Sequence, residues 1–574
     1  MSRARAGGLA YRHMLGRRSR AQGERNHIVA MLAVLVVIGL LAAAGSTLES
    51  ADTVPGGSPQ ATQPEGPLEG GTLTIAFGEE PRSLDPAFAT DRTSANLVGN
   101  LFDPLVRLGP DLEPEPALAR EWHVSEGGRR IVFLLRPEAR WTNGEPVVAA
   151  DVVAAWKRVL SPGLASPLAS MLHGIKGAAA YNRCTERCAD AEDAVGVTAP
   201  GDHRLVVRLV APQPWFVRLT ALTPFLPVHR GTVLRHGDRW TEPGTIVTNG
   251  PFVLGGRTDR SVSLVRNPRF RAATRVSIAR VEGRVVADAR ARVQAFDDGS
   301  VLALDGSPLP EADLPGLRER REYEAYPTLR ATGFAFNLAG ITDVHQRRAM
   351  ALAVDREALV ENATRGGEAA ATRFVPEGMP HAGRAAPESP WAPASGDLEA
   401  ARAELDDAAI VKRRVTLLHL DGAEQREVAL FLADAWGELG IETTVRSRPE
   451  ESFLDFPGPL SRSSVDLYQQ DLDPWIPDPW STLALWACGA DANKANFCSV
   501  AYDELLAQAR RELNGLARSD LHARAEELLT GRTGTLPVLP VYRPTYTTLE
   551  SLQVQDTFAV NPLGQIDFST VTLD

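Results

Sequence analysis

The hydrophobic residues of this chain recur with two periods, which predict its strands and helices. In the segment GTLTIAFGEEP at 71–81, apolar residues alternate with Thr and Ala, as in a strand with one buried face. Residues 131–135 form a continuous apolar run with β-branched and aromatic members, which favours a buried strand. An Asn-Gly turn at 143–144 follows. The next predicted helix buries one face, made of Val152, Val153, Trp156, Val159 and Leu160. We interpret this block as scaffold.

A second region combines the two periods in an informative order. Residues 413–420 predict a strand, 428–439 an amphipathic helix, and 441–447 another strand. Strand, helix and strand with short joints make a βαβ unit. Further strands are predicted at 203–212 and 261–270. The fold class predicted from these patterns is mixed α/β.

A helical pattern also covers residues 345–363.

At 574 residues the chain is too long for a single hydrophobic core. A typical domain size of about 150 residues suggests three or four structural units. With 44% hydrophobic and 23% charged residues, neither a disordered chain nor a polytopic membrane protein fits.

The N-terminus predicts a membrane-targeting segment. Residues 28–45 carry no charge and follow an Arg-rich lead, and small residues at 42–44 fit an Ala-x-Ala cleavage site. A secretory signal peptide fits this pattern, although the apolar length also reaches the lower limit for an uncleaved anchor. No cysteine comes directly after this apolar run, so the sequence lacks the cysteine that would carry a lipid anchor. Residues 46–70 are rich in Pro, Gly, Ser and Thr and predict a flexible linker.

Charge separates this lead from the rest of the chain. The first 27 residues hold seven Arg and one Glu, a local charge of +6. Because the whole chain has a net charge of −11, the remaining 547 residues must carry −17. An acidic body argues against a nucleic-acid partner, because phosphate backbones call for a basic face.

Four cysteines form two local pairs. They are Cys184, Cys188, Cys488 and Cys498. In an exported protein the simple interpretation is two disulfides, 184–188 and 488–498, although four cysteines allow three connectivities. Zinc is the alternative, but nine residues separate the second pair, which departs from the usual Cys-x2–4-Cys spacing.

The common catalytic motifs are absent from the sequence: the nucleophile elbow, the zinc-protease helix, the phosphate loop and the dinucleotide fingerprint. One stretch does stand out, DLDPWIPDPW at 471–480. Three prolines exclude a regular helix, so it is predicted to be a stiff loop. Its Trp rings and carboxylates suit an amphipathic ligand that carries an amine. Alternatively, the tryptophans fill the core and the aspartates cap helices.

Several motifs in order resemble a known family. They are SLDPAFATD with NLFDPLV, then LAREWHVSEGGRRIVFLLRPEARWTNGEPVVAADV, NGPFVL with LVRNPRF, FNLAG with RRAMALAVDREALV, and NFCSVAYDELL. Together they resemble the extracytoplasmic solute-binding proteins of the peptide/nickel type, family 5, that serve ABC importers. The resemblance covers residue 71 to the C-terminus. It implies a two-lobed periplasmic-binding-protein-like fold of class II, with an extra domain on the first lobe.

The resemblance also implies domain boundaries. After the segments 1–45 and 46–70 described above, they are the first lobe at 71–112, 231–339 and 531–574, the extra domain at 113–230, and the second lobe at 340–530.

By the same resemblance, ligand contacts come from the segment after SLDP and from the loop at 471–480. In peptide-binding relatives an aspartate four residues before a proline meets the peptide amine. That position here is Trp475 or Gln470, so Asp471 or Asp473 is expected to substitute. Near residues 453–455 an expected aromatic is replaced by Glu450 or Glu451. The predicted ligand-binding set is Thr90, Asp91, Arg92, Glu450, Asp471, Asp473, Trp475, Asp478 and Trp480.

The function predicted on this basis is non-catalytic capture of a peptide or similar small solute and its delivery to an ABC permease. The resemblance implies an extracytoplasmic monomer without cofactor, metal or nucleic acid, possessing no enzyme activity. The two alternatives are a secreted hydrolase and a sensor or scaffold with a degenerate cleft. The solute itself does not follow from the sequence, because relatives take different ligands on one architecture.

Overall fold

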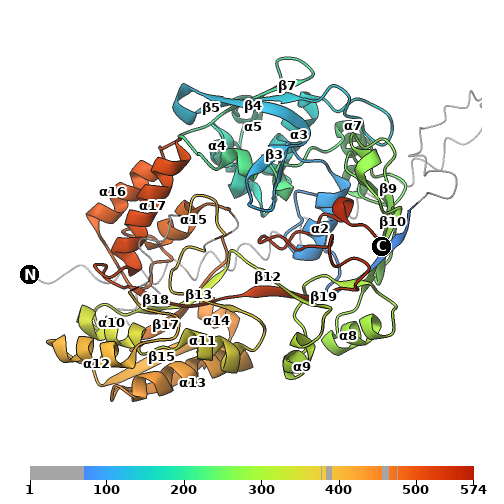
Figure 1. Ribbon diagram of the computed structural model, residues 1–574. Helices are drawn as coiled ribbons and strands as arrows, with labels where there is room; N and C mark the ends of the chain where they lie inside the picture. Colours follow the sequence, from blue (N-terminus) through green and yellow to red (C-terminus); the bar gives the residue numbers. More distant parts are fainter. Residues whose placement is uncertain (1–69, 377, 383–390, 455–463, 475, 574) are drawn as a thin grey trace, which may run out of the picture. The chain divides into compact units, whose positions relative to one another are not determined.

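The structure is a computed structural model that describes residues 70–573 except 377, 383–390, 455–463 and 475 (Figure 1). These residues all belong to one compact unit, Pro59–Asp574. The predicted signal segment and nearly all of the predicted linker therefore lie outside the described residues. Among the described residues no helix has the length and apolar character needed to cross a membrane.

The first lobe is built on a five-stranded sheet in the order β11-β1-β10-β9-β8. Strand β1 runs parallel to both β10 and β11, while β10, β9 and β8 are antiparallel. The apolar residues of the predicted first strand are buried, as the alternation indicates. The strands are β1 (Thr72–Phe77), β8 (Phe252–Arg257), β9 (Ser261–Arg266), β10 (Arg280–Val285) and β11 (Ala303–Leu304), and helices α2 (Arg92–Leu101), α7 (Arg230–His236), α8 (Ala289–Asp297) and α9 (Leu314–Arg318) accompany them.

The extra domain contains a four-stranded sheet in the order β4-β5-β7-β6. Its helix α3 packs against β6 and β7, as predicted for the scaffold block. The elements are β4 (Ala119–Ser125), β5 (Arg130–Leu135), β6 (Val197–Thr198), β7 (Arg204–Arg208), α3 (Ala149–Leu160), α4 (Ala178–Asn182) and α5 (Cys188–Asp193), with a small ribbon of β2 (Val106–Leu108) and β3 (Pro114–Pro116) beside them.

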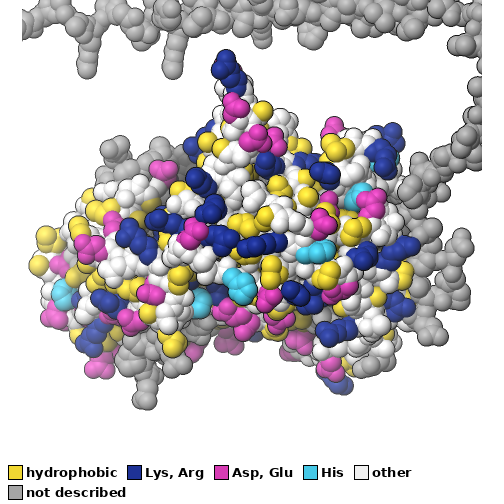
Figure 2. Space-filling model, turned by 90° about the horizontal axis from the view of Figure 1, so that it is seen from above, with side chains coloured by type: hydrophobic (Ala, Val, Ile, Leu, Met, Phe, Trp, Pro, Cys, Tyr) yellow, Lys and Arg dark blue, Asp and Glu magenta, His cyan; other side chains and the backbone are white. Residues whose placement is uncertain are grey.

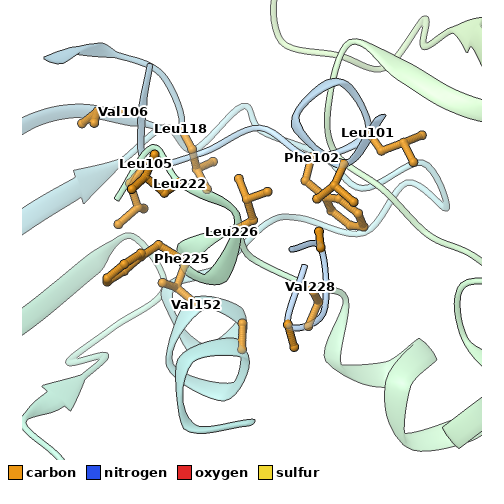
Figure 3. Close-up of a cluster of buried hydrophobic side chains, with 14 of the residues drawn as sticks. Leu101, Phe102, Leu105, Val106, Leu118, Val152, Leu222, Phe225, Leu226 and Val228 are labelled. Carbon is orange, nitrogen blue, oxygen red and sulfur yellow. The ribbon is translucent and has the colours of Figure 1, made fainter. Parts of the chain in front are cut away.

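The first lobe and the extra domain share one continuous hydrophobic core. The same buried cluster includes Ile75 and Phe77 of β1 and Phe133 and Trp156 of the extra domain. Figure 3 shows part of it, where side chains at the end of α2, such as Phe102, lie with Val152 of α3 and the segment around Leu226. Because apolar contacts run from one sheet to the other without a break, the two should move as one body.

The second lobe holds a six-stranded sheet in the order β14-β18-β13-β17-β15-β16. Strands β15 and β16 are parallel and α13 joins them, which confirms the predicted βαβ unit. The strands are β13 (Ala331–Phe336), β14 (Ala369–Ala370), β15 (Arg414–Leu420), β16 (Glu442–Arg448), β17 (Leu467–Leu472) and β18 (Val538–Arg543). The main helices are α10 (Val344–Leu352), α11 (Arg356–Leu359), α12 (Leu398–Asp407), α13 (Ala423–Gly437), α15 (Pro479–Leu483), α16 (Val500–Ala509) and α17 (Gly515–Thr530).

The helical pattern predicted over 345–363 is confirmed, but the chain divides it into separate helical segments. Helix α10 ends at Leu352, and Asp355 then caps α11 by accepting a hydrogen bond from the Ala358 N–H at 2.8 Å. A π-helical turn, Val360–Thr364, follows. A side chain that caps a helix start competes with continuous helix at that residue.

The strand pairing differs from the lobe boundaries implied by the resemblance. Strands β13 and β18 lie in segments assigned to the first lobe, yet both pair in the six-stranded sheet. A two-stranded ribbon of β12 (Tyr323–Pro327) and β19 (Thr545–Leu549) precedes β13 and follows β18. The main-chain hydrogen bonds thus favour crossings between the lobes near 328–330 and 544. The other boundaries stay a prediction.

The predicted disulfides are confirmed. Cys184 is bonded to Cys188 and Cys488 to Cys498. No His, Cys, Asp and Glu cluster suited to a metal ion occurs in the part of the chain that the structure describes. On the face shown in Figure 2, basic, acidic and hydrophobic side chains are intermixed, so neither sign of charge dominates that face.

Replacing Trp156 with Ala should destabilise the extra domain by about 3–5 kcal/mol. The indole is fully buried, donates a hydrogen bond from Nε1 to the Phe225 carbonyl at 2.8 Å and meets the Phe225 ring edge-on at 5.3 Å. Urea titration measures the free energy of unfolding. The affinity for the solute should change little, because Trp156 is predicted to be scaffold. A variant with native stability and no binding would contradict the scaffold role.

The buried Glu550 should make stability depend on pH. Its carboxylate accepts hydrogen bonds from Tyr326 and Thr548, and burial, aided by Glu324, raises its pKa to about 7. Between the ordinary pKa of 4.5 and 7, the folded protein keeps a proton that the unfolded chain releases, so this group's contribution falls as pH rises through that window.

We therefore expect Glu550→Gln to melt at a higher temperature than the native protein at pH 8 and at nearly the same temperature at pH 5. Glu399→Gln, at an exposed glutamate, is the control and should melt like the native protein at both pH values. An equal effect of Glu550→Gln at both pH values would show that this carboxyl does not titrate in the window.

Candidate ligand-binding site

The predicted segment Thr90 to Arg92 forms the start of helix α2. Thr90 is exposed. Asp91 caps the helix, because its Oδ1 accepts the Ser94 N–H at 2.7 Å and its Oδ2 accepts the Ser94 hydroxyl at 2.6 Å. The Asp91 carboxylate is thus engaged in its own helix, which leaves Thr90 as the freer side chain for a solute.

Arg92 joins three segments that lie far apart in sequence. Its Nη2 donates to Ser307 Oγ at 2.7 Å and lies 3.6 Å from the buried Asp305. Its guanidinium also lies over the Tyr546 ring, 5.3 Å from the centroid. The side chain is only 18% exposed. Arg92 therefore holds the start of α2 against the turn after β11 and against β19.

Asp471 lies near the end of β17, opposite Thr332 of β13. Thr332 Oγ1 and Gln469 Nε2 each donate to its carboxylate at 2.8 Å. The residue is exposed to water, yet the protein around it raises the pKa of its carboxyl, while the two hydrogen bonds lower that pKa. The Asp471 carboxylate is therefore held in place by its two hydrogen bonds and is also exposed to a solute.

More carboxylates share this environment. Tyr542 donates a hydrogen bond to Glu424 Oε1 at 3.0 Å. Burial raises the pKa of Glu424, and the charges of Glu368, Glu311 and Asp471 raise it further. A cationic group brought here would relieve that repulsion.

The other two aspartates of the predicted loop differ sharply. The Asp473 side chain is 78% exposed and lies 3.8 Å from Arg330 Nε. Asp478 is fully buried, caps α15 by accepting the Trp480 N–H at 3.0 Å, and forms an ion pair with the buried Arg518. Of the two, only Asp473 is placed where a solute could reach it, and a ligand contact at Asp478 stays an untested prediction that its burial disfavours.

The remaining predicted residues are scattered. Trp480 stacks on Trp215 of the extra domain, with ring centroids 4.8 Å apart and planes at 16°. Glu450 is exposed at the start of α14 (Glu450–Leu454). Trp475 lies outside the described residues, and nothing in the structure tests its predicted role.

Sequence reasoning missed the partners that build these environments. Ser307, Tyr546 and Thr332 are ordinary residues in strands or turns, and no local pattern links them to Arg92 or Asp471. Arg518 did carry a signal, because it interrupts the buried stripe of α17 that continues with Leu521 and Leu529. A charged residue on an apolar face requires a buried partner, which here is Asp478.

Comparisons with known proteins agree with this architecture. The model of bacterial extracellular solute-binding proteins, family 5 Middle, matches residues 113–494. The dipeptide-binding protein DppE of Bacillus subtilis is 29% identical over 511 residues, 86% of this chain and 90% of that protein. The probable deoxycholate-binding periplasmic protein YgiS of Escherichia coli is 29% identical over 478 residues, 81% of this chain and 86% of that one.

Among solved structures, the unliganded open form of the murein tripeptide-binding protein MppA matches with a TM-score of 0.78 at 26% identity, covering 88% of this chain and 98% of that one. The family match spans well over half of the chain. The two-lobed fold predicted from the sequence is thereby confirmed. The chain belongs to family 5 of the bacterial extracellular solute-binding proteins.

Proposed function

We propose that this protein captures a peptide or similar small solute outside the cytoplasm and presents it to the permease of an ABC importer. The observation that carries this proposal is the similarity to DppE, a dipeptide-binding protein, over 86% of the chain. Capture needs no covalent chemistry, so the protein acts by binding alone.

The strand topology supplies a means of closure. The second lobe is joined to the rest of the described chain through β12 and β19, and candidate contacts lie on both sides of this ribbon, Thr90 in the first lobe and Asp471 in the second. A solute that touches both lobes binds the closed arrangement better, so it shifts the population toward that arrangement.

The charges on the second lobe favour a solute with a cationic group. Asp471 and Asp473 are both exposed, and Glu424 and Glu368 add negative charge near Asp471. Thr332 and Gln469 hold the Asp471 carboxylate in place, which lowers the entropy cost of an ion pair there. A peptide amine or a basic side chain has the required chemistry.

We expect the protein purified under native conditions to carry a cationic solute, which mass spectrometry identifies. Calorimetry with that solute should show that Asp471→Asn weakens binding by about 2–5 kcal/mol, because a partly desolvated charge pair is lost. Asp259→Asn, at an exposed aspartate outside the segments 90–92 and 471–480, is the matched control and should bind the solute normally.

A tryptic peptide mixture incubated with the protein should remain intact, since a hydrolase would cleave it.

Native affinity in both Asp471→Asn and Asp473→Asn would place the solute elsewhere. A protein that carries no solute and retains nothing from the peptide mixture would contradict capture itself and favour a scaffold.

Asp478 should prove structural. Asp478→Ala leaves the buried Arg518 without its partner, so we expect a loss of about 3–5 kcal/mol in the free energy of unfolding. Asp473→Ala, in the same loop but exposed, should change it by about 0.5 kcal/mol or less. Denaturant titration measures both. If Asp478→Ala kept its stability and lost only solute binding, the ligand role would be correct instead.

A further inference from the structure

A concave site lies apart from Thr90, Asp471 and Asp473, the residues proposed to hold the solute. It is a pocket of about 350 Å³ between the extra domain and helices α15 and α16. Pro212, Trp480 and Leu506 form part of its apolar wall, and neither Asp471 nor the segment at 90–92 lines it. Its volume falls in the range of roughly 300–1,000 Å³ that small-molecule sites occupy.

The polar lining of this pocket is mostly cationic. Arg129 comes from the extra domain, and Arg510 and Arg511 from the end of α16. No carboxylate in the described part of the chain forms an ion pair with any of the three. The single acidic residue of the lining, Asp503, accepts the Cys488 N–H at 3.2 Å. In a chain of net charge −11, three such arginines around one recess favour an anionic ligand.

Buried contacts hold the two walls of the pocket together. Trp480 stacks on Trp215 of the extra domain, which is 2% exposed, and the Arg518 guanidinium lies 5.4 Å from the Trp215 ring centroid. Beside them, Nη2 of Arg218 in the extra domain lies 2.9 Å from Nε2 of His381 in the second lobe. In the arrangement of the lobes that the structure describes, these contacts hold both walls in place without a ligand, so less ordering opposes binding.

We propose that this pocket binds an amphipathic anion, a small molecule with one carboxylate on an apolar body. The apolar body packs on Pro212, Leu506 and the edge of Trp480, whose ring already meets Trp215 and Arg510. The carboxylate meets Arg510 and Arg511, whose guanidinium groups can bind it through paired N–H donors. Arg510 already lies over the Trp480 ring, 5.4 Å from its centroid, which places a cation at the edge of the apolar surface.

A small molecule fits these observations better than a segment of a partner protein. The charged and apolar linings converge on one recess of limited volume, whereas a protein segment would need an extended groove. The site shares only Trp480 with the predicted solute contacts, so its occupation does not depend on the proposed function.

The probe is octanoate, titrated into the purified protein by calorimetry. Two matched compounds separate the contributions: octyl glucoside below its micelle concentration has the same chain without the charge, and acetate has the charge without the chain. We expect octanoate to bind at one site, and each matched compound to bind at least about tenfold more weakly. Added salt should weaken octanoate binding.

Variants then locate the site. Arg510→Gln and Arg511→Gln should each weaken octanoate binding about tenfold, because each removes a charge-assisted hydrogen bond. Ala507→Trp, at an exposed lining position of α16, should fill the pocket and abolish binding. Arg235→Gln, at an exposed arginine of α7 far from the lining, is the control and should bind normally.

Four results would overturn the proposal. The first three are undetectable octanoate binding at millimolar concentration, equal affinity for octanoate and octyl glucoside, and native affinity in the double variant Arg510→Gln, Arg511→Gln. Loss of octanoate binding in Asp471→Asn with normal binding in Ala507→Trp would move the anion to the solute site and also overturn it. Capture of the cationic solute should be unaffected by Arg511→Gln, so failure of one proposal leaves the other standing.

Discussion

The antiparallel ladder between β12 and β19 is the constraint on which the arrangement of the described chain depends. Tyr323 pairs with Leu549 and Pro327 with Thr545, so the segments entering and leaving the second lobe lie side by side. All strands of the six-stranded sheet occur between these two segments. A paired ribbon resists shear but can twist and bend, which makes it suited to carry one lobe as a single body.

The first lobe is rigid for a different reason. Its core continues into the extra domain, so α2, β1 and α3 share buried neighbours. The second lobe has two further hydrophobic clusters on its own sheet, and one of them also includes Leu112, which lies between β2 and β3. Relative movement of the lobes would have to break the contacts at the boundary between these cores. The polar link of Arg218 to His381 and the stacked Trp215 and Trp480 lie across this boundary.

Local patterns predicted the local elements well. The buried strand at 131–135, the helix carrying Trp156, the βαβ unit of the second lobe and the two short-range disulfides all depend on neighbours within a few turns of chain. The pairing of β13 with β17 and β18 did not follow from periodicity, because a strand pattern states which face is buried and not which strand lies beside it. The same limit applies to the site. Asp478 looked like a ligand contact because of its aromatic and proline neighbours, and only its distant partner Arg518 shows that it is buried.

The ribbon also imposes an order on folding during synthesis. β12 is made more than two hundred residues before its partner β19, and β1 likewise precedes β10, with which it pairs in parallel. Pairing between such distant segments is slow, since a long loop must close before any contact forms. The strand that joins the lobes therefore remains without its partner until almost the whole chain has left the ribosome. Until then its edge is open to aggregation and proteolysis.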